Sequence, residues 1–363
     1  MKRLLVTTAA VAAVTAPALA PTAAHAADEV TVTSPGCAQL RLTNTSQSTL
    51  VVSLDTGRDI KLSPGTSQTV SSLRSGGHVY TVSHADSEFL YKPKRVVVPG
   101  CSGVERRSSD GDQNGDERAD VLGIQAGTGD LYYYRMTNKG LAPGIKAGTG
   151  WNKMIFMQQV TELYSGTSDD YLVAVRDDRT VWRYKNMGQG RFANGTKLAT
   201  LPADTDNFTV DKLNNPSHFG QHALLARQGS TLKRWIITAD GLKTDQSVMA
   251  TGWGNTTKTL ALGDFNTDLS ADLISIRRDG TMWLSENDGN VYAESTYSRH
   301  KKVGHGWHKM GIVTSPGSVD GDQLPDLIAR RDDGKLYRYG NHRGQWGPAE
   351  QIGFNWKGIR LLA

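Results

Sequence analysis

Acidic residues recur in three short stretches of the C-terminal two-thirds of the chain, with a spacing that could bind a cation. Each stretch places oxygen-bearing side chains at positions 1, 3, 5 and 9, and the backbone carbonyl of position 7 is a further potential ligand. Calcium takes about six to eight hard oxygen ligands, which a tight loop with alternate residues turned inward can supply. The candidate ligands are Asp112, Asn114, Asp116, Arg118 and Asp120; Asp264, Asn266, Asp268, Ser270 and Asp272; and Ser318, Asp320, Asp322, Leu324 and Asp326. We therefore predict Ca²⁺ sites in these three loops.

An EF-hand is the obvious competitor for such a spacing, but it requires Gly at position 6. Position 6 is Glu117, Leu269 or Gln323, and an apolar strand pattern follows each loop where an EF-hand has a helix. The alternative without a metal is an Asp-rich turn whose carboxylates accept hydrogen bonds from backbone amides. Because no candidate base neighbours the loops, a bound calcium ion would have a structural role.

The acidic loops belong to a sequence unit that repeats about every 51 residues. The last acids of the first two loops, Asp120 and Asp272, are 152 residues apart, which leaves room for two copies without the loop. Those copies are recognisable at 170–178 and 222–229, so five units fill residues 104–363. The C-terminal segment 356–363 matches the segment that precedes the loop in other units, and it therefore supplies the strand that the first unit lacks.

Units of about four short strands cannot bury both sheet faces alone, so they must pack against one another. A chain whose last segment completes its first unit indicates a closed arrangement, whereas an open solenoid would need capping repeats. We therefore predict an all-β fold with a five-bladed β-propeller over residues 104–363.

Tryptophan closes four of the five units, as in the segment 148–151, whereas the second unit has Leu201, Pro202 and Ala203 at this place. The flat indole could stack on a sugar ring, and repetition would give multivalent binding. The alternative is that the large side chain packs between repeats. The candidate ligand-binding residues are Trp151, Trp253, Trp307 and Trp356.

Residues 1–26 have the features of a secretory signal peptide: Lys2 and Arg3 precede an apolar run, and Ala24 and Ala26 suit a cleavage site. No later run reaches the length of about 20 apolar residues that spans a bilayer. We expect a secreted, extracellular protein without a membrane span. Removing Lys2 and Arg3 lowers the net charge from +5 to +3, and the chain has no basic cluster that would indicate nucleic-acid binding.

Residues 27–103 contain short alternating strand patterns separated by turn residues, which predicts a small immunoglobulin-like β-sandwich. The two cysteines of the chain, Cys37 and Cys101, bracket this segment. Exported proteins oxidise such pairs, and a disulfide closing about 65 residues would stabilise the segment by roughly 4 kcal/mol.

The acidic loops, best seen in 263–266, resemble the FG-GAP or VCBS repeats of integrin-type propellers and of many secreted actinobacterial proteins. Those families often have seven blades, so five is a departure. The blade number and the Gly-x-Gly-Trp ending resemble tachylectin-2-type five-bladed lectins, which bind N-acetylated amino sugars between adjacent blades. These resemblances imply a binding module, and related propellers also serve as recognition subunits of secreted toxin particles.

The sequence contains no HExxH, GxSxG or glycine-rich phosphate motif, so we expect a protein that is not an enzyme. The first hypothesis is a secreted, lectin-like protein that recognises a cell-surface glycan. The alternative is a subunit that binds an extracellular protein in a complex or toxin particle. The third hypothesis, a hydrolase, would need a pair of catalytic acids that sequence alone does not reveal.

Overall fold

The computed structural model describes residues 29–35, 39–54, 58–71, 76–85, 94–98, 111–161, 170–212, 222–267, 271–287 and 297–363. Strands dominate this part of the chain, so the predicted all-β class is confirmed. Its helices are 3-10 turns of three residues each, and none has the length and apolar character needed to cross a membrane. The predicted signal segment 1–26, Cys37 and Cys101 lie outside the described residues.

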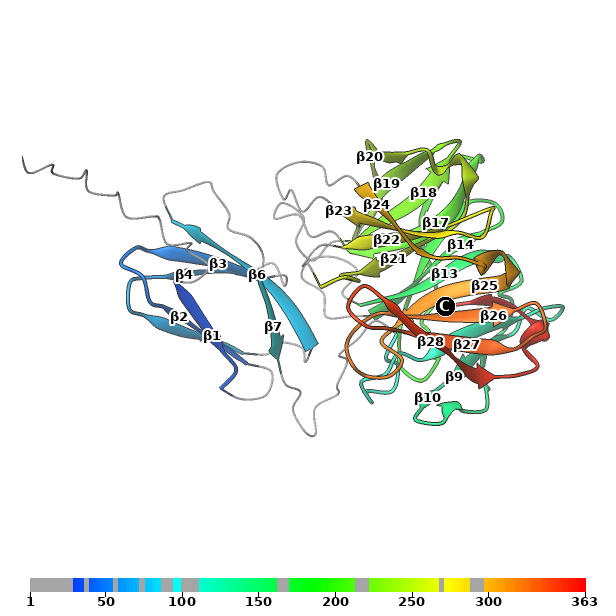
Figure 1. Ribbon diagram of the computed structural model, residues 1–363, viewed down its shortest axis with the longest axis horizontal. Coiled ribbons are helices and arrows are strands. Elements are labelled where there is room, and N and C mark those ends of the chain that lie inside the picture. The colour runs from blue at the N-terminus through cyan, green and yellow to red at the C-terminus, as the bar shows by residue number, and fades with distance from the viewer. Residues whose placement is uncertain are drawn as a thin grey trace, which may run out of the picture.

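The N-terminal strands form two antiparallel sheets with one shared core (Figure 1). Leu40 and Leu42 from one sheet and Leu50 and Val52 from the other are completely buried in the same cluster. Every second residue of these strands faces that core, as the two-residue period of a strand requires. The sheets consist of β1 (Val30–Thr33), β2 (Leu40–Asn44) and β5 (Ser67–Val70), and of β4 (Asp59–Leu62), β3 (Leu50–Leu54), β6 (Gly76–His84) and β7 (Lys94–Val98).

The remaining described residues form five four-stranded antiparallel sheets, here called sheets one to five, and a small hairpin. In strand order they are β29 (Ile359–Leu362), β8 (Val121–Gln125), β9 (Leu131–Tyr134) and β12 (Ile145–Gly148); β13 (Met154–Thr161), β14 (Asp170–Arg176), β15 (Thr180–Lys185) and β16 (Thr196–Thr200); β17 (Thr205–Lys212), β18 (His222–Gln228), β19 (Thr231–Thr238) and β20 (Gly241–Thr251); β21 (Thr256–Gly263), β22 (Asp272–Arg277), β23 (Met282–Asn287) and β24 (Tyr297–Gly304); β25 (Met310–Gly317), β26 (Asp326–Arg331), β27 (Leu336–Asn341) and β28 (Trp346–Gly353). The hairpin pairs β10 (Met136–Thr137) with β11 (Gly140–Leu141).

The C-terminal strand β29 belongs to sheet one, where it pairs with β8. Ala363 and Leu122 exchange two backbone hydrogen bonds of 2.8 and 3.0 Å, and both residues are buried. The prediction that the last segment supplies the missing strand of the first unit is therefore confirmed.

Hydrophobic packing connects the five sheets in a cycle. Each of five buried clusters draws its residues mainly from two consecutive sheets, and one of them joins sheet five to sheet one through Ile328, Trp356 and Val121. The first strands of the sheets also contact one another in the same cyclic order. Figure 1 shows these sheets as one body, with the N-terminal strands as another.

The Gly-x-Gly-Trp ending has a defined backbone geometry. The first glycine makes room for the indole: a Cβ at Gly304 would lie 2.6 Å from Nε1 of Trp307. The second has a φ of 78° at Gly306 and of 64° at Asn355, in the left-handed region that favours glycine and asparagine.

The tryptophan backbone N–H then donates to the carbonyl of the preceding hairpin turn in all four copies, at 2.8–3.0 Å. Leu201 makes the same bond to Arg179, at 3.0 Å, so it takes the place of tryptophan in the second unit.

Candidate functional site

The first acidic loop uses its carboxylates to hold its own backbone. Oδ1 of the buried Asp112 accepts hydrogen bonds from the backbone amides of Asn114 (3.2 Å) and Gly115 (2.7 Å), and Oδ2 accepts one from Glu117 (2.9 Å). Asp120, which is completely buried, accepts a hydrogen bond from the Tyr133 hydroxyl at 2.8 Å. These hydrogen bonds are those of an Asp-rich turn.

The last aspartate of each loop has the same structural role in all three copies. Its Oδ2 accepts a hydrogen bond from the backbone amide of loop position 2, which is Gln113 (3.3 Å), Phe265 (3.2 Å) or Val319 (2.9 Å). The other oxygen of Asp120 accepts from the Met136 amide at 2.8 Å, and that of Asp326 from the Asn341 amide at 2.9 Å. These carboxylates therefore connect the start of the loop to the strands that follow it.

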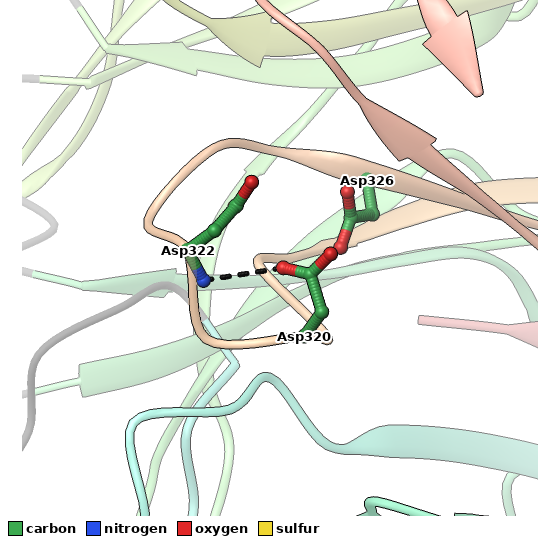
Figure 2. Close-up of side chains that lie close together, drawn as sticks. All are labelled: Asp320, Asp322 and Asp326. Atoms are coloured by element: carbon green, nitrogen blue, oxygen red, sulfur yellow. Dashed lines mark hydrogen bonds between the residues drawn. The ribbon is translucent and has the colours of Figure 1, made fainter.

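The third loop gathers its carboxylates most closely (Figure 2). Asp320, Asp322 and Asp326 each place a carboxylate oxygen within 4.8 Å of the other two, and in the described part of the chain no other group of three acidic, histidine or cysteine side chains does so. The Ser318 hydroxyl lies 3.3 Å from Oδ1 of Asp322. Arg338 lies 3.4 Å from Asp320 and is the nearby compensating charge.

Burial and mutual repulsion make full ionisation of this group unfavourable. Burial raises the pKa of Asp326 to about 7, and the charges of Asp320 and Asp322 add to that shift. Burial also raises the pKa of Asp322, and Asp320 contributes. A cation placed among the three carboxylates would reverse these shifts because it favours the charged forms.

The structure places the other predicted ligands less completely. Asp116 is exposed and accepts a hydrogen bond from the Arg118 amide at 3.2 Å. Asn266 is half-buried and its backbone N–H donates to Oδ2 of Asp272 at 3.3 Å. Among the remaining candidates, Asp264 and Leu324 are half-buried, whereas Asp268 and Ser270 lie outside the described residues.

The loop backbone has left-handed residues that the sequence did not reveal. Position 4 has a positive φ in all three loops, at Gly115 (80°), Thr267 (65°) and Gly321 (84°). Position 6 also has a positive φ, at Glu117 (68°) and Gln323 (69°). The turn that glycine makes in an EF-hand is therefore made here by residues with a side chain.

The four candidate tryptophans are buried at junctions between consecutive sheets. Three of them pack on a tyrosine of the next sheet, with ring centroids 4.8 Å apart for Trp151 and Tyr184, 4.9 Å for Trp307 and Tyr339, and 4.5 Å for Trp356 and Tyr134. The Nε1 of Trp253 donates instead to the Thr259 hydroxyl at 3.0 Å. These contacts are those of inter-sheet packing, and a ligand-binding role for the tryptophans stays a prediction.

The junction between sheets five and one, here called the five–one junction, holds a cavity of about 470 Å³. Trp356 and Tyr134 belong to its lining, together with Tyr132, Gln125 and Phe354. Phe354 is 72% exposed and is therefore accessible to a ligand. None of the described residues that line the cavity is acidic or basic.

Sequence reasoning identified Trp356 but none of its neighbours in this cavity. One signal was present: the variable residue of the Gly-x-Gly-Trp ending is Thr149, Thr251 or His305 in other units and Phe354 in the last. The tyrosines could not be assigned because their position relative to Trp356 depends on the closure of the cycle of sheets.

Comparisons with known proteins show distant structural similarity only. No protein-family model matches the sequence, and no curated protein matches it. The BP39L lectin of Burkholderia pseudomallei has a TM-score of 0.37 and 10% identity over 90% of this chain and 99% of that chain. AofleA of Arthrobotrys oligospora has a TM-score of 0.36 and 12% identity over 90% and 92% of the two chains. At these values neither fold detail nor function carries over to this chain.

Proposed function

We propose that this chain is a secreted, non-catalytic protein that binds a cell-surface glycan in the cavity of the five–one junction. In this proposal the five sheets form a five-bladed β-propeller, residues 1–26 direct export, and Cys37 and Cys101 form a disulfide in an N-terminal immunoglobulin-like domain. The observation that carries the binding function is the set of aromatic side chains around one cavity between two sheets.

The cavity has the size and chemistry of a small-ligand site. Its volume of about 470 Å³ falls in the range of about 300–1,000 Å³ that is usual for such sites. Sugar rings present C–H groups to aromatic faces and hydroxyls to polar groups, and the lining offers Tyr132 and Phe354 for the first and the amides of Gln125 and Asn355 for the second. Aromatic faces combined with hydrogen-bonding groups therefore suit a saccharide.

The binding proposal is tested at Phe354, because this side chain is exposed and its removal leaves the core intact. We expect Phe354→Ala to weaken binding on a glycan array and in calorimetry by roughly tenfold, the equivalent of about 1.4 kcal/mol. The matched control is Ile145→Ala, which removes an apolar side chain that is 62% exposed and does not line the cavity. Equal loss in both variants, or glycan binding unaffected by Phe354→Ala, would reject this site.

A second candidate function, recognition of an extracellular protein, is favoured by the exposure of Phe354. Contiguous exposed apolar patches mark protein–protein interaction sites, and Phe354 adjoins the aromatic lining of the cavity. A protein that co-purifies with the wild-type chain and is lost from Phe354→Ala, without any glycan binding, would support this alternative.

We further propose that Ca²⁺ binds the acidic loops and stiffens them, with the third loop as the best-supported site. The residues present fit the ion: Asp320, Asp322 and Asp326 offer convergent carboxylate oxygens, and Ser318 and the Leu324 carbonyl are further oxygen donors. In the first loop, Asp112 and Asp120 already accept backbone amides, so a cation would share those oxygens. The ion would supply positive charge and no catalytic step.

Calcium binding is tested by thermal unfolding of the chelator-treated protein. Adding calcium should raise Tm, by about 2–4 °C for each kcal/mol of binding free energy, and Asp322→Asn should reduce the rise. Asp333→Asn is the matched control, because Asp333 is a half-exposed acid in the β26–β27 turn of the same sheet. An unchanged Tm on calcium addition to the wild type would exclude a site in any of the loops.

A further inference from the structure

The five–one junction lacks side chains that cover the corresponding aromatic ring or fill the corresponding space at other junctions. Tyr132 and Tyr134 are two residues apart in β9 and so share one face of the strand, the face that meets Trp356. In the other sheets the residues that correspond to Tyr132 are Trp182, Lys233, Trp283 and Tyr337. Three of these four are aromatic, so the junctions are built alike.

An arginine covers the aromatic ring at each of those three junctions. The guanidinium carbon lies 4.0 Å from the ring centroid for Arg176 and Trp182, 4.4 Å for Arg277 and Trp283, and 3.9 Å for Arg331 and Tyr337. Such stacking is favourable because the ring face is electron-rich. The ring face is then occupied by the protein itself.

Sheet one has Gln125 where sheets two, four and five have this arginine; sheet three has Gln228 there, but its residue corresponding to Tyr132 is Lys233 and not an aromatic one. The backbone N–H of Gln125 donates to the carbonyl of Asp130 at 2.8 Å, and Asp130 stands two residues before Tyr132. The Arg277 amide makes the same bond to Thr281, at 2.9 Å and two residues before Trp283. Glutamine has no charge to attract it to a ring face, and both Gln125 and Tyr132 line the cavity.

A second substitution enlarges the same junction. Gly144 and Gly195 are equivalent, because a Cβ on either would lie 2.4 Å from the ring of Tyr134 or Tyr184. Three residues before them stand Leu141 in sheet one and Phe192 in sheet two. The Phe192 ring lies 6.2 Å from that of Trp151, whereas the smaller Leu141 lines the open cavity.

Resting on the proposed function, we infer that the five–one junction is a single saccharide site selective for uncharged sugars, and that Gln125 and Leu141 are its specificity residues. At three other junctions the arginine occupies the ring face that a sugar would need. Among the described residues that line the cavity, none is acidic or basic, so a uronate or sialate carboxylate would lose hydration without a compensating ion pair. The two–three junction has Lys233 and Leu201 in place of Tyr132 and Trp356, so the expected stoichiometry is one per chain although the unit occurs five times.

The experiment is a calorimetric titration with a panel of neutral di- and trisaccharides and with the matching oligosaccharides that end in a uronate or a sialate. For the wild type we expect one equivalent per chain and at least tenfold weaker binding of the acidic members. Gln125→Arg should abolish binding because the new guanidinium stacks on Tyr132. Leu141→Phe should also abolish binding, because the larger phenylalanine side chain would fill the cavity. Arg299→Gln, at a 66% exposed position of β24 that does not line the cavity, is the matched control and should bind as the wild type does.

The outcomes separate this inference from the proposed function. No saccharide binding by the wild type would remove the proposed function and the inference with it. Several equivalents per chain, equal affinity for acidic sugars, or undiminished binding by folded Gln125→Arg and Leu141→Phe would overturn the inference and leave glycan binding standing. Circular dichroism and Tm establish that each variant is folded.

Discussion

Gln323 occupies a left-handed backbone position in the third acidic loop, with a φ of 69°. This conformation costs a residue with a Cβ about 1 kcal/mol or more of conformational free energy, whereas glycine adopts it readily. We expect Gln323→Gly to raise the free energy of unfolding by about 0.5–1 kcal/mol, measured by chemical denaturation in the presence of a chelator. Gln351→Gly, at an exposed strand position of β28, is the control and should be destabilising. A loss of stability in Gln323→Gly would contradict the strain assigned to this position.

Asp120 gives the calcium-free protein a pH dependence of known sign. Burial raises its pKa from the usual value near 3.8 to about 7, so the folded state binds the proton more tightly than the unfolded chain does. The contribution of Asp120 to stability is therefore complete below about pH 4 and is lost as the pH rises through 7. In chelator, the free energy of unfolding of the wild type minus that of Asp120→Asn should fall between pH 4 and 7. A difference that is constant or rises with pH would contradict this account.

The Gly-x-Gly-Trp turn at 304–307 fixes the indole of Trp307 between two sheets. A Cβ at Gly304 would lie 2.6 Å from Nε1 of Trp307 and 3.3 Å from the Cβ of Met282, and neither the indole nor the strand has room to move freely. We expect Gly304→Ala to cost roughly 1–3 kcal/mol of unfolding free energy, as overpacked sites do. His305→Ala, at the exposed position beside it, should be within about 0.5 kcal/mol of wild type. Equal effects of the two would show that the indole contact contributes little.

Closure by the C-terminal strand affects the whole set of sheets. β29 pairs with β8, and Arg360 on β29 donates to the carbonyl of Met154 at 2.8 Å and to that of Trp151 at 2.6 Å. Deleting residues 359–363 therefore exposes an edge of sheet one and removes contacts to sheets five and two. We expect a large fall in Tm and broadened unfolding in calorimetry, whereas Arg360→Gln should cause only a moderate fall. A deletion variant with the wild-type transition would contradict closure.

Local patterns were sufficient to predict much of the fold. Alternation of apolar and polar residues in segments such as Leu50–Leu54 predicts strands, because one face must be buried. The unit occurs five times and its first copy lacks one strand, which predicts that Ile359–Leu362 completes sheet one. The loop positions from Asp112 to Asp120 were also visible, because ligand spacing along a turn is a local property.

What the loops and the tryptophans do was decided by tertiary contacts. The sequence contains a similar Asp-rich pattern three times, yet Asp112 of the first loop accepts backbone amides with both oxygens, whereas Asp320, Asp322 and Asp326 of the third loop converge. Likewise the sequence determined that Trp356 ends a unit. Only the closed cycle of sheets brings it against Tyr134, and the cavity beside the two rings is lined by residues of both sheets. Contacts between residues more than 200 positions apart follow from how the sheets pack and not from any local spacing.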